Sequence, residues 1–236
     1  MTGEFDTFQS FVHALNNSGV PYLVLRNYEN LLSPEIYVGG HGDIDLLCTD
    51  SRLLAEKVGA RSYNNKVKEV CGDGVHYYVL VAGKHVSLDL RSIGDGYYCT
   101  LWQKGMLERR VLWNGFYVMN DYDYLYSLIH HAILQKRFFS DEYRFRLTEM
   151  CNRLHIKKKD DSAQSFIMLL EEYMGEHGYT YTYPTDTFVP LNKKYISCRL
   201  LEPNAALAYK HWKFDTKVAF IEFLVKIKHM LFGAPR

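Results

Sequence analysis

The spacing of apolar residues changes near residue 120 of this 236-residue chain, and this change constrains the fold more than any other feature. Before residue 120 the spacing mostly follows the period of two that strands require, and after it the period of 3.6 that helices require. The sequence therefore predicts an α+β fold: a mixed β-sheet half, residues 1–119, followed by an all-helical half, residues 120–236. Hydrophobic residues make up 47% of the chain, enough to build a core.

Individual elements follow from the same pattern and from turn and cap residues. Gly72-Asp73-Gly74 indicates a hairpin, and Asp50, Ser140 and Ser162 are suited to begin helices. The strands expected are residues 22–25, 43–48, 67–71, 75–81, 85–91 and 116–118. The helices expected are residues 4–18, 50–58, 102–107, 121–136, 140–154, 162–174, 203–212 and 215–232.

Charge and cysteine content exclude several classes of protein. There are 28 Lys and Arg against 27 Asp and Glu, so the net charge of +1 gives no overall attraction to nucleic acid, and no nucleic-acid partner is expected. The N-terminus carries acids where a signal peptide needs basic residues, and no apolar stretch is long enough to span a membrane. The five cysteines form no C-x-x-C pair. We therefore expect a cytoplasmic protein with reduced thiols.

The segment Gly39-Gly-His-Gly-Asp-Ile-Asp-Leu-Leu47 is the most informative for function. On a strand, Asp43 and Asp45 point to the same face, where two parallel carboxylates need a cation. Mg²⁺ is the natural choice because it prefers oxygen ligands and substrate phosphates. Asp89 lies within the strand expected at 85–91 and supplies a third carboxylate. A lone D-x-D also occurs at strand ends that face solvent, but the glycine-rich approach and the third acid together favour a metal site.

These residues and the order of the elements around them resemble the nucleotidyltransferase superfamily with the DNA polymerase β-like fold, particularly its small bacterial members. The resemblance covers about residues 1–95. It implies Mg²⁺, which Mn²⁺ can replace, with Asp43, Asp45 and Asp89 as metal ligands and catalytic residues and Asp89 helping to deprotonate the acceptor. It also implies a nucleoside triphosphate and a small acceptor hydroxyl, on a sugar or an antibiotic-like molecule, as substrates.

One departure concerns the triphosphate. The family commonly carries a Gly-Ser pair after its first strand, whereas this chain has Leu25-Arg26-Asn27 there. Side-chain donors can replace a backbone cradle because guanidinium groups match phosphate oxygens, although a surface ion pair is an equal interpretation of Arg26. His130 and His131 are expected to pack between helices. The candidate nucleotide-binding residues are Arg26, Asn27, Gly40, His41, Gly42, Arg91 and Lys136.

Two other functions compete with nucleotidyl transfer. Glycosyltransferases also use D-x-D, but usually after a longer nucleotide-binding region than the 42 residues that precede Asp43 here. A noncatalytic binding or regulatory module with the same fold would explain the missing Gly-Ser pair. For the helix at 215–232, burial within the protein is the default expectation, with a homodimer or a membrane surface as the alternative contacts.

Overall fold

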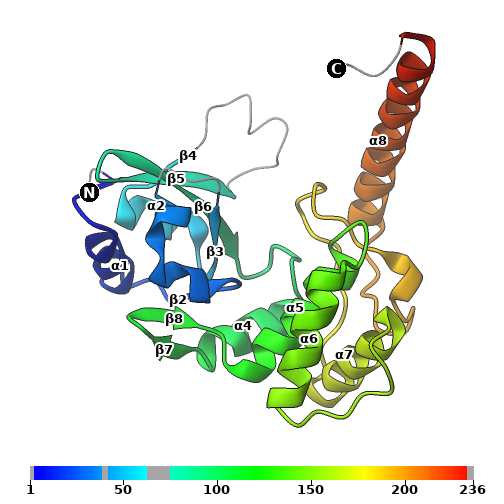
Figure 1. The fold of residues 1–236 in the computed structure, drawn as a ribbon, viewed down its shortest axis with the longest axis horizontal. Helices are drawn as coiled ribbons and strands as arrows, with labels where there is room; N and C mark the ends of the chain where they lie inside the picture. The colour runs from blue at the N-terminus through cyan, green and yellow to red at the C-terminus, as the bar shows by residue number, and fades with distance from the viewer. Residues whose placement is uncertain (1–2, 39–41, 63–74, 233–236) are drawn as a thin grey trace.

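The structure is a computed structural model that describes residues 3–38, 42–62 and 75–232. It confirms the α+β fold class: a mixed sheet with helices α1 and α2 beside it leads into a helical half (Figure 1). The strands are β1 (Glu4–Phe5), β2 (Tyr22–Val24), β3 (Asp43–Cys48), β4 (Arg61–Ser62), β5 (His76–Val81), β6 (Lys84–Ser92), β7 (Val111–Trp113) and β8 (Phe116–Val118).

The described strands form one sheet in the order β1-β5-β6-β3-β2-β8-β7, with β4 paired to β5. Strand β3 lies parallel to β6 and antiparallel to β2, so the sheet is mixed at its centre. Both neighbours of β3 bury apolar side chains against it, which explains why Ile44, Leu46 and Leu47 are almost fully buried. The central position of β3 fixes the direction in which Asp43 and Asp45 point.

The helices begin where side chains can accept the first free backbone N–H groups. The side chains of Asp50, Ser140 and Ser162 accept such hydrogen bonds, which confirms all three predicted caps. The helices are α1 (Phe8–Asn16), α2 (Ser51–Val58), α4 (Thr100–Glu108), α5 (Asp121–Leu134), α6 (Asp141–Arg153), α7 (Ala163–His177) and α8 (Ala205–Phe232), with short 3-10 turns at Tyr28–Leu32, Pro34–Ile36 and Lys193–Tyr195.

Three predictions about elements need correction. Glu4 and Phe5 pair with β5 instead of starting a helix, because Thr7 caps α1. Strand β7 was not predicted; it pairs with β8 across Asn114 and Gly115, which both adopt positive φ. The two patterns expected at 203–212 and 215–232 form the single helix α8. The strand expected at 67–71 and its hairpin turn lie outside the described residues.

Helix α8 is not buried within the protein, contrary to the default expectation. In Figure 1 it extends away from the rest of the molecule. Its side chains Phe220, Phe223 and Met230 are 60%, 58% and 78% exposed. Because an apolar side chain gains no stabilisation from such exposure, this helix still has an unburied surface after the chain has folded.

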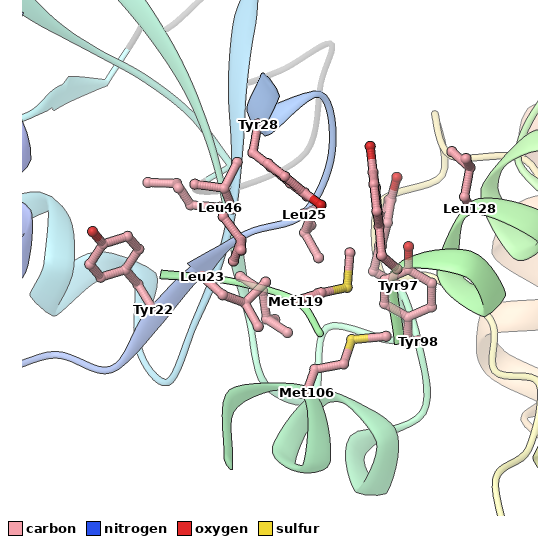
Figure 2. Close-up of a cluster of buried hydrophobic side chains, with 14 of the residues drawn as sticks. Tyr22, Leu23, Leu25, Tyr28, Leu46, Tyr97, Tyr98, Met106, Met119 and Leu128 are labelled. Carbon is pink, nitrogen blue, oxygen red and sulfur yellow. The ribbon is translucent and has the colours of Figure 1, made fainter. Parts of the chain in front are cut away.

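A continuous core joins the sheet to the helices. Figure 2 shows Leu23, Leu25 and Leu46 on the sheet side and Tyr97, Tyr98 and Leu128 on the helical side of one buried cluster. Tyr97 and Tyr98 lie between β6 and α4, so the chain segment leaving the sheet supplies the rings that fill the junction. The boundary at 119/120 stays a prediction, although α4, which precedes it, already packs against α5 and α7 through Trp102.

His130 and His131 lie buried within α5, as expected for residues that pack between helices. Burial lowers the pKa of His130 to about 3, and burial together with the charge of Arg26 lowers the pKa of His131 well below 6.5. Both rings are therefore neutral in the folded chain, while the unfolded chain protonates them as pH falls. We expect stability to be lost from about pH 6.5 towards pH 3, by up to about 1.4 kcal/mol per pH unit for each ring.

Urea unfolding at pH 7 and pH 5 measures this effect. His130→Phe keeps an aromatic ring in the site but removes the titration, so its loss of stability between the two pH values should be smaller than that of the wild type. His13 is exposed on α1, and His13→Gln serves as the control for replacing a histidine on the surface. An identical pH dependence for His130→Phe and the wild type would contradict the assignment.

Candidate functional site

Three carboxylates share one face of the sheet beside the helical half. Asp43 and Asp45 alternate along β3, and the parallel pairing with β6 places Asp45 directly beside Asp89. Neighbouring strands lie about 4.8 Å apart, so the two side chains emerge next to each other. The burial pattern along β3 agrees, because Asp43 and Asp45 reach solvent while Ile44 and Leu46 do not. The strand register thus places the three predicted acids on one face of the sheet, while their role as metal ligands stays a prediction.

The charges of these acids act on one another. Partial burial raises the pKa of Asp43, and the negative charges of Asp89 and Asp45 raise it further, in that order. A hydrogen bond with Ser87 and the charge of His76 lower the pKa of Asp43 and offset part of this repulsion. A cation beside Asp43 would remove the repulsion, which is the electrostatic reason to consider a metal there.

Arg26 follows β2 and contacts the site from the neighbouring strand. Its Nη2 atom lies 2.6 Å from Oδ1 of Asp45, and its Nη1 atom donates to the hydroxyl of Tyr97 at 2.7 Å. The Arg26 side chain is 9% exposed. Arg26, the predicted phosphate ligand, therefore already holds a site carboxylate, in a partly buried ion pair.

The contacts of Arg26 continue into the helical half. The Tyr97 hydroxyl lies 3.3 Å from Nδ1 of His131, and the guanidinium of Arg91 stacks 4.5 Å from the centre of the Tyr97 ring. Arg91 also pairs with Asp186 at 3.3 Å and is buried. A buried polar network thus links the acids on the sheet to α5 and to the segment around residue 186.

His76 is a site residue that the sequence interpretation missed. Its Nδ1 atom lies 2.6 Å from Oδ1 of Asp89, because the two residues are direct partners across the antiparallel pair of β5 and β6. The hydrogen bond to Asp89 raises the pKa of His76, which is the largest effect on that group. Asp89 is therefore oriented by a neighbouring strand and keeps its second oxygen for another partner.

The remaining predicted nucleotide-binding residues are dispersed. Asn27 adopts a left-handed backbone conformation, and its side chain accepts a hydrogen bond from Arg146 of α6 at 2.7 Å. Gly42 contacts the turn at Ile36 and Tyr37 just before β3. Lys136 lines a different pocket at the base of α8. Gly40 and His41 lie outside the described residues.

The donor chemistry of the three acids suits a hard cation such as Mg²⁺, because all three supply carboxylate oxygens. Within the described ranges, however, no group of three or more His, Cys, Asp or Glu side chains lies in position to hold a metal ion. Arg26 engages one oxygen of Asp45, and His76 engages one oxygen of Asp89. A metal would therefore have to use the oxygens that these contacts leave and the carboxylate of Asp43.

A surface pocket of about 590 Å³ lies on α6. Arg146 joins it to the site, because this side chain contacts Asn27 and also pairs with Glu29 at 3.3 Å. The pocket is lined by Glu29, Tyr124, Glu142, Phe145, Arg146, Glu149, Met150 and Arg153. Its lining combines carboxylates, guanidinium groups and the exposed ring of Phe145.

Comparisons with known proteins leave the family open. No family model matches the sequence, and no curated protein matches it. Among solved structures, the chain is similar to the antibiotic-resistance factor ANT(2'')-Ia, with 12% identity and a TM-score of 0.37, over 74% of this chain and 95% of that chain. A likeness at this level carries no activity or substrate to the present chain. Among the described helices, none has the length and apolar character needed to cross a membrane.

Proposed function

We propose that this protein is a metal-dependent nucleotidyltransferase that moves a nucleotidyl group from a nucleoside triphosphate to a hydroxyl of a small acceptor. The observation that carries the proposal is the register of β3 and β6, which places Asp45 beside Asp89 with Asp43 on the same face. The order of elements on which the resemblance rests is also present: a helix, a strand, the strand with Asp43 and Asp45, and then the strand with Asp89.

The chemistry follows from the charges. Asp43, Asp45 and Asp89 would hold Mg²⁺, which when bound neutralises the triphosphate and the negative charge that grows during transfer. The acceptor oxygen forms a bond to the α-phosphorus while the bond to pyrophosphate breaks, and the hydroxyl proton passes to Asp89. His76 orients Asp89 for this step through the 2.6 Å hydrogen bond.

The pocket on α6 is the proposed acceptor site. Glu142, Glu149 and Arg146 provide hydrogen-bonding groups for hydroxyl or amino substituents, and Phe145, which is 68% exposed, offers a ring face for stacking. This combination suits a polyhydroxylated molecule such as a sugar or an antibiotic-like acceptor better than a purely apolar one.

A second candidate function has its own observation. Because Arg26 engages Asp45 and His76 engages Asp89, two of the three acids have partners within the chain without a ligand. A noncatalytic binding or regulatory module would keep such contacts permanently, whereas an enzyme must rearrange at least part of them to accept a metal. The two candidates therefore differ in turnover and not in fold.

Release of pyrophosphate distinguishes them. We expect the wild type, supplied with Mg²⁺, each nucleoside triphosphate in turn and a panel of sugars and aminated sugars, to release pyrophosphate together with one nucleotidylated acceptor. Release of a nucleoside diphosphate from a sugar nucleotide would instead identify a glycosyltransferase. Saturable nucleotide binding without product over the whole panel would favour the noncatalytic module.

A further inference from the structure

Helix α6 lies beside the segment that carries Arg26 and contacts its surroundings through two side chains. Arg146 donates to the side chain of Asn27, the residue next to Arg26, at 2.7 Å. The ring of Tyr143 lies 5.9 Å from the ring of His131 in a T-shaped contact. Because residues three positions apart are neighbours on a helix surface, both contacts come from one side of the first turns of α6.

Tyr143 is linked to Arg26 through the side chain of His131. The Nδ1 atom of His131 lies 3.3 Å from the Tyr97 hydroxyl, which accepts a hydrogen bond from Arg26 at 2.7 Å. Burial raises the pKa of Tyr143, and the charge of Arg26 is the next largest effect and lowers it. The charge of Asp45 also raises this pKa. The phenol of Tyr143 is therefore within electrostatic reach of both members of the Arg26–Asp45 pair.

The hydroxyl of Tyr143 is available to a ligand. The side chain is half-buried, and within the described part of the chain its hydroxyl has no hydrogen-bond partner. A tyrosine hydroxyl that is only partly accessible to water normally finds a partner. Phosphate oxygens accept hydrogen bonds from such a donor, and Arg26 beside it would attract their negative charge.

We propose that Tyr143 is a further residue of the triphosphate site and that its hydroxyl donates a hydrogen bond to a phosphate oxygen beside Arg26. The proposal rests on the proposed function, which supplies the nucleoside triphosphate as the ligand. The contact with His131 fixes the ring and so directs the hydroxyl. Tyr143 thus provides, from the helical half, a donor that the missing Gly-Ser pair does not provide from the sheet.

Calorimetric titration with inorganic tripolyphosphate in the presence of Mg²⁺ tests this role, because the probe carries the phosphates without a base or a sugar. We expect the wild type to bind it and Tyr143→Phe to bind it at least about tenfold more weakly, since a hydrogen bond to a charged group is lost. Phenylalanine keeps the ring beside His131, so the variant should melt at the wild-type temperature. Tyr122 is 54% exposed in the first turn of α5, and Tyr122→Phe should bind as the wild type does.

Equal affinities of the wild type and Tyr143→Phe for tripolyphosphate would overturn the proposal, and so would absence of binding by the wild type. A loss of affinity for a nucleoside triphosphate but not for tripolyphosphate would also overturn it, because Tyr143 would then contact the base or the sugar. Tripolyphosphate binding that depends on Tyr143, without pyrophosphate release from any nucleotide, would refute nucleotidyl transfer and support the role of Tyr143. Turnover by the wild type with unchanged tripolyphosphate affinity in Tyr143→Phe would do the reverse.

Discussion

Replacing Asp123 with alanine should lower the free energy of unfolding by roughly 3–5 kcal/mol, the cost typical of breaking a buried charged network. Asp123 is fully buried in the first turn of α5. Its carboxylate accepts hydrogen bonds from Trp102 at 3.0 Å, Tyr173 at 2.9 Å, Asn120 at 2.7 Å and Arg109 at 2.9 and 3.1 Å. These donors come from α4, α7 and the start of α5, so one side chain joins three helices.

The cost arises mainly from the donors that would lose their partner. Trp102 and Tyr173 are buried and would be left with unsatisfied polar groups, whereas Arg109 is partly exposed and can turn to water. Asp121 is a matched control, because it lies in the same turn but forms an exposed pair with Arg153 at 3.1 Å. Asp121→Ala should change stability by less than about 1 kcal/mol.

Urea unfolding of the two variants tests the role assigned to Asp123. The expected result is a large shift of the midpoint for Asp123→Ala and a small one for Asp121→Ala. Similar midpoints for both variants would show that the network contributes little beyond what an exposed acid in that turn provides.

Features that depend on neighbours in sequence were predictable. The strand Asp43–Cys48 follows from alternation, and the helix beginnings at Asp50, Ser140 and Ser162 follow from short polar side chains that accept local N–H groups. The common face of Asp43 and Asp45 needs only the period of a strand.

Contacts between distant residues were harder to predict. The pair of His76 and Asp89 was nevertheless within reach, because a two-residue turn at Ala82 and Gly83 fixes the register of the hairpin and places these residues opposite each other. The pair of Arg26 and Asp45 depends on how β2 lies beside β3, which no local pattern contains.

The C-terminal helix shows a different limit. The sequence predicted two helices, at 203–212 and 215–232, but no glycine or proline interrupts the chain between Ala205 and Phe232 and the helix is continuous. Its exposure was also not predictable, since a helix rich in apolar residues is normally buried.

Asp43→Asn should weaken binding of Mg²⁺ with nucleotide at least about 10-fold, because removing a metal ligand costs at least as much as removing a residue that only orients a ligand. In the absence of metal, the same variant should melt at an equal or higher temperature than the wild type. Burial and the charges of Asp89 and Asp45 already raise the pKa of Asp43, so a neutral amide relieves repulsion there.

The opposite effects on stability and on cation binding make Asp43 the best residue to replace. Asp45→Asn would also remove the partner of the buried Arg26, so a change in its binding could reflect altered structure. Glu56 is exposed on α2, and Glu56→Gln serves as the control for loss of one negative charge outside the site.

Titration with Mn²⁺ in the presence of a nucleoside triphosphate, followed by electron paramagnetic resonance of the free ion, tests the metal site most directly. Nucleotide alone also binds Mn²⁺, so the quantity to compare is the additional Mn²⁺ bound when protein is present. The wild type and Glu56→Gln should bind additional Mn²⁺ with equal affinity, and Asp43→Asn should bind it at least about 10-fold more weakly. Equal binding by Asp43→Asn and the wild type, or no additional binding by the wild type, would contradict a metal site formed by Asp43, Asp45 and Asp89.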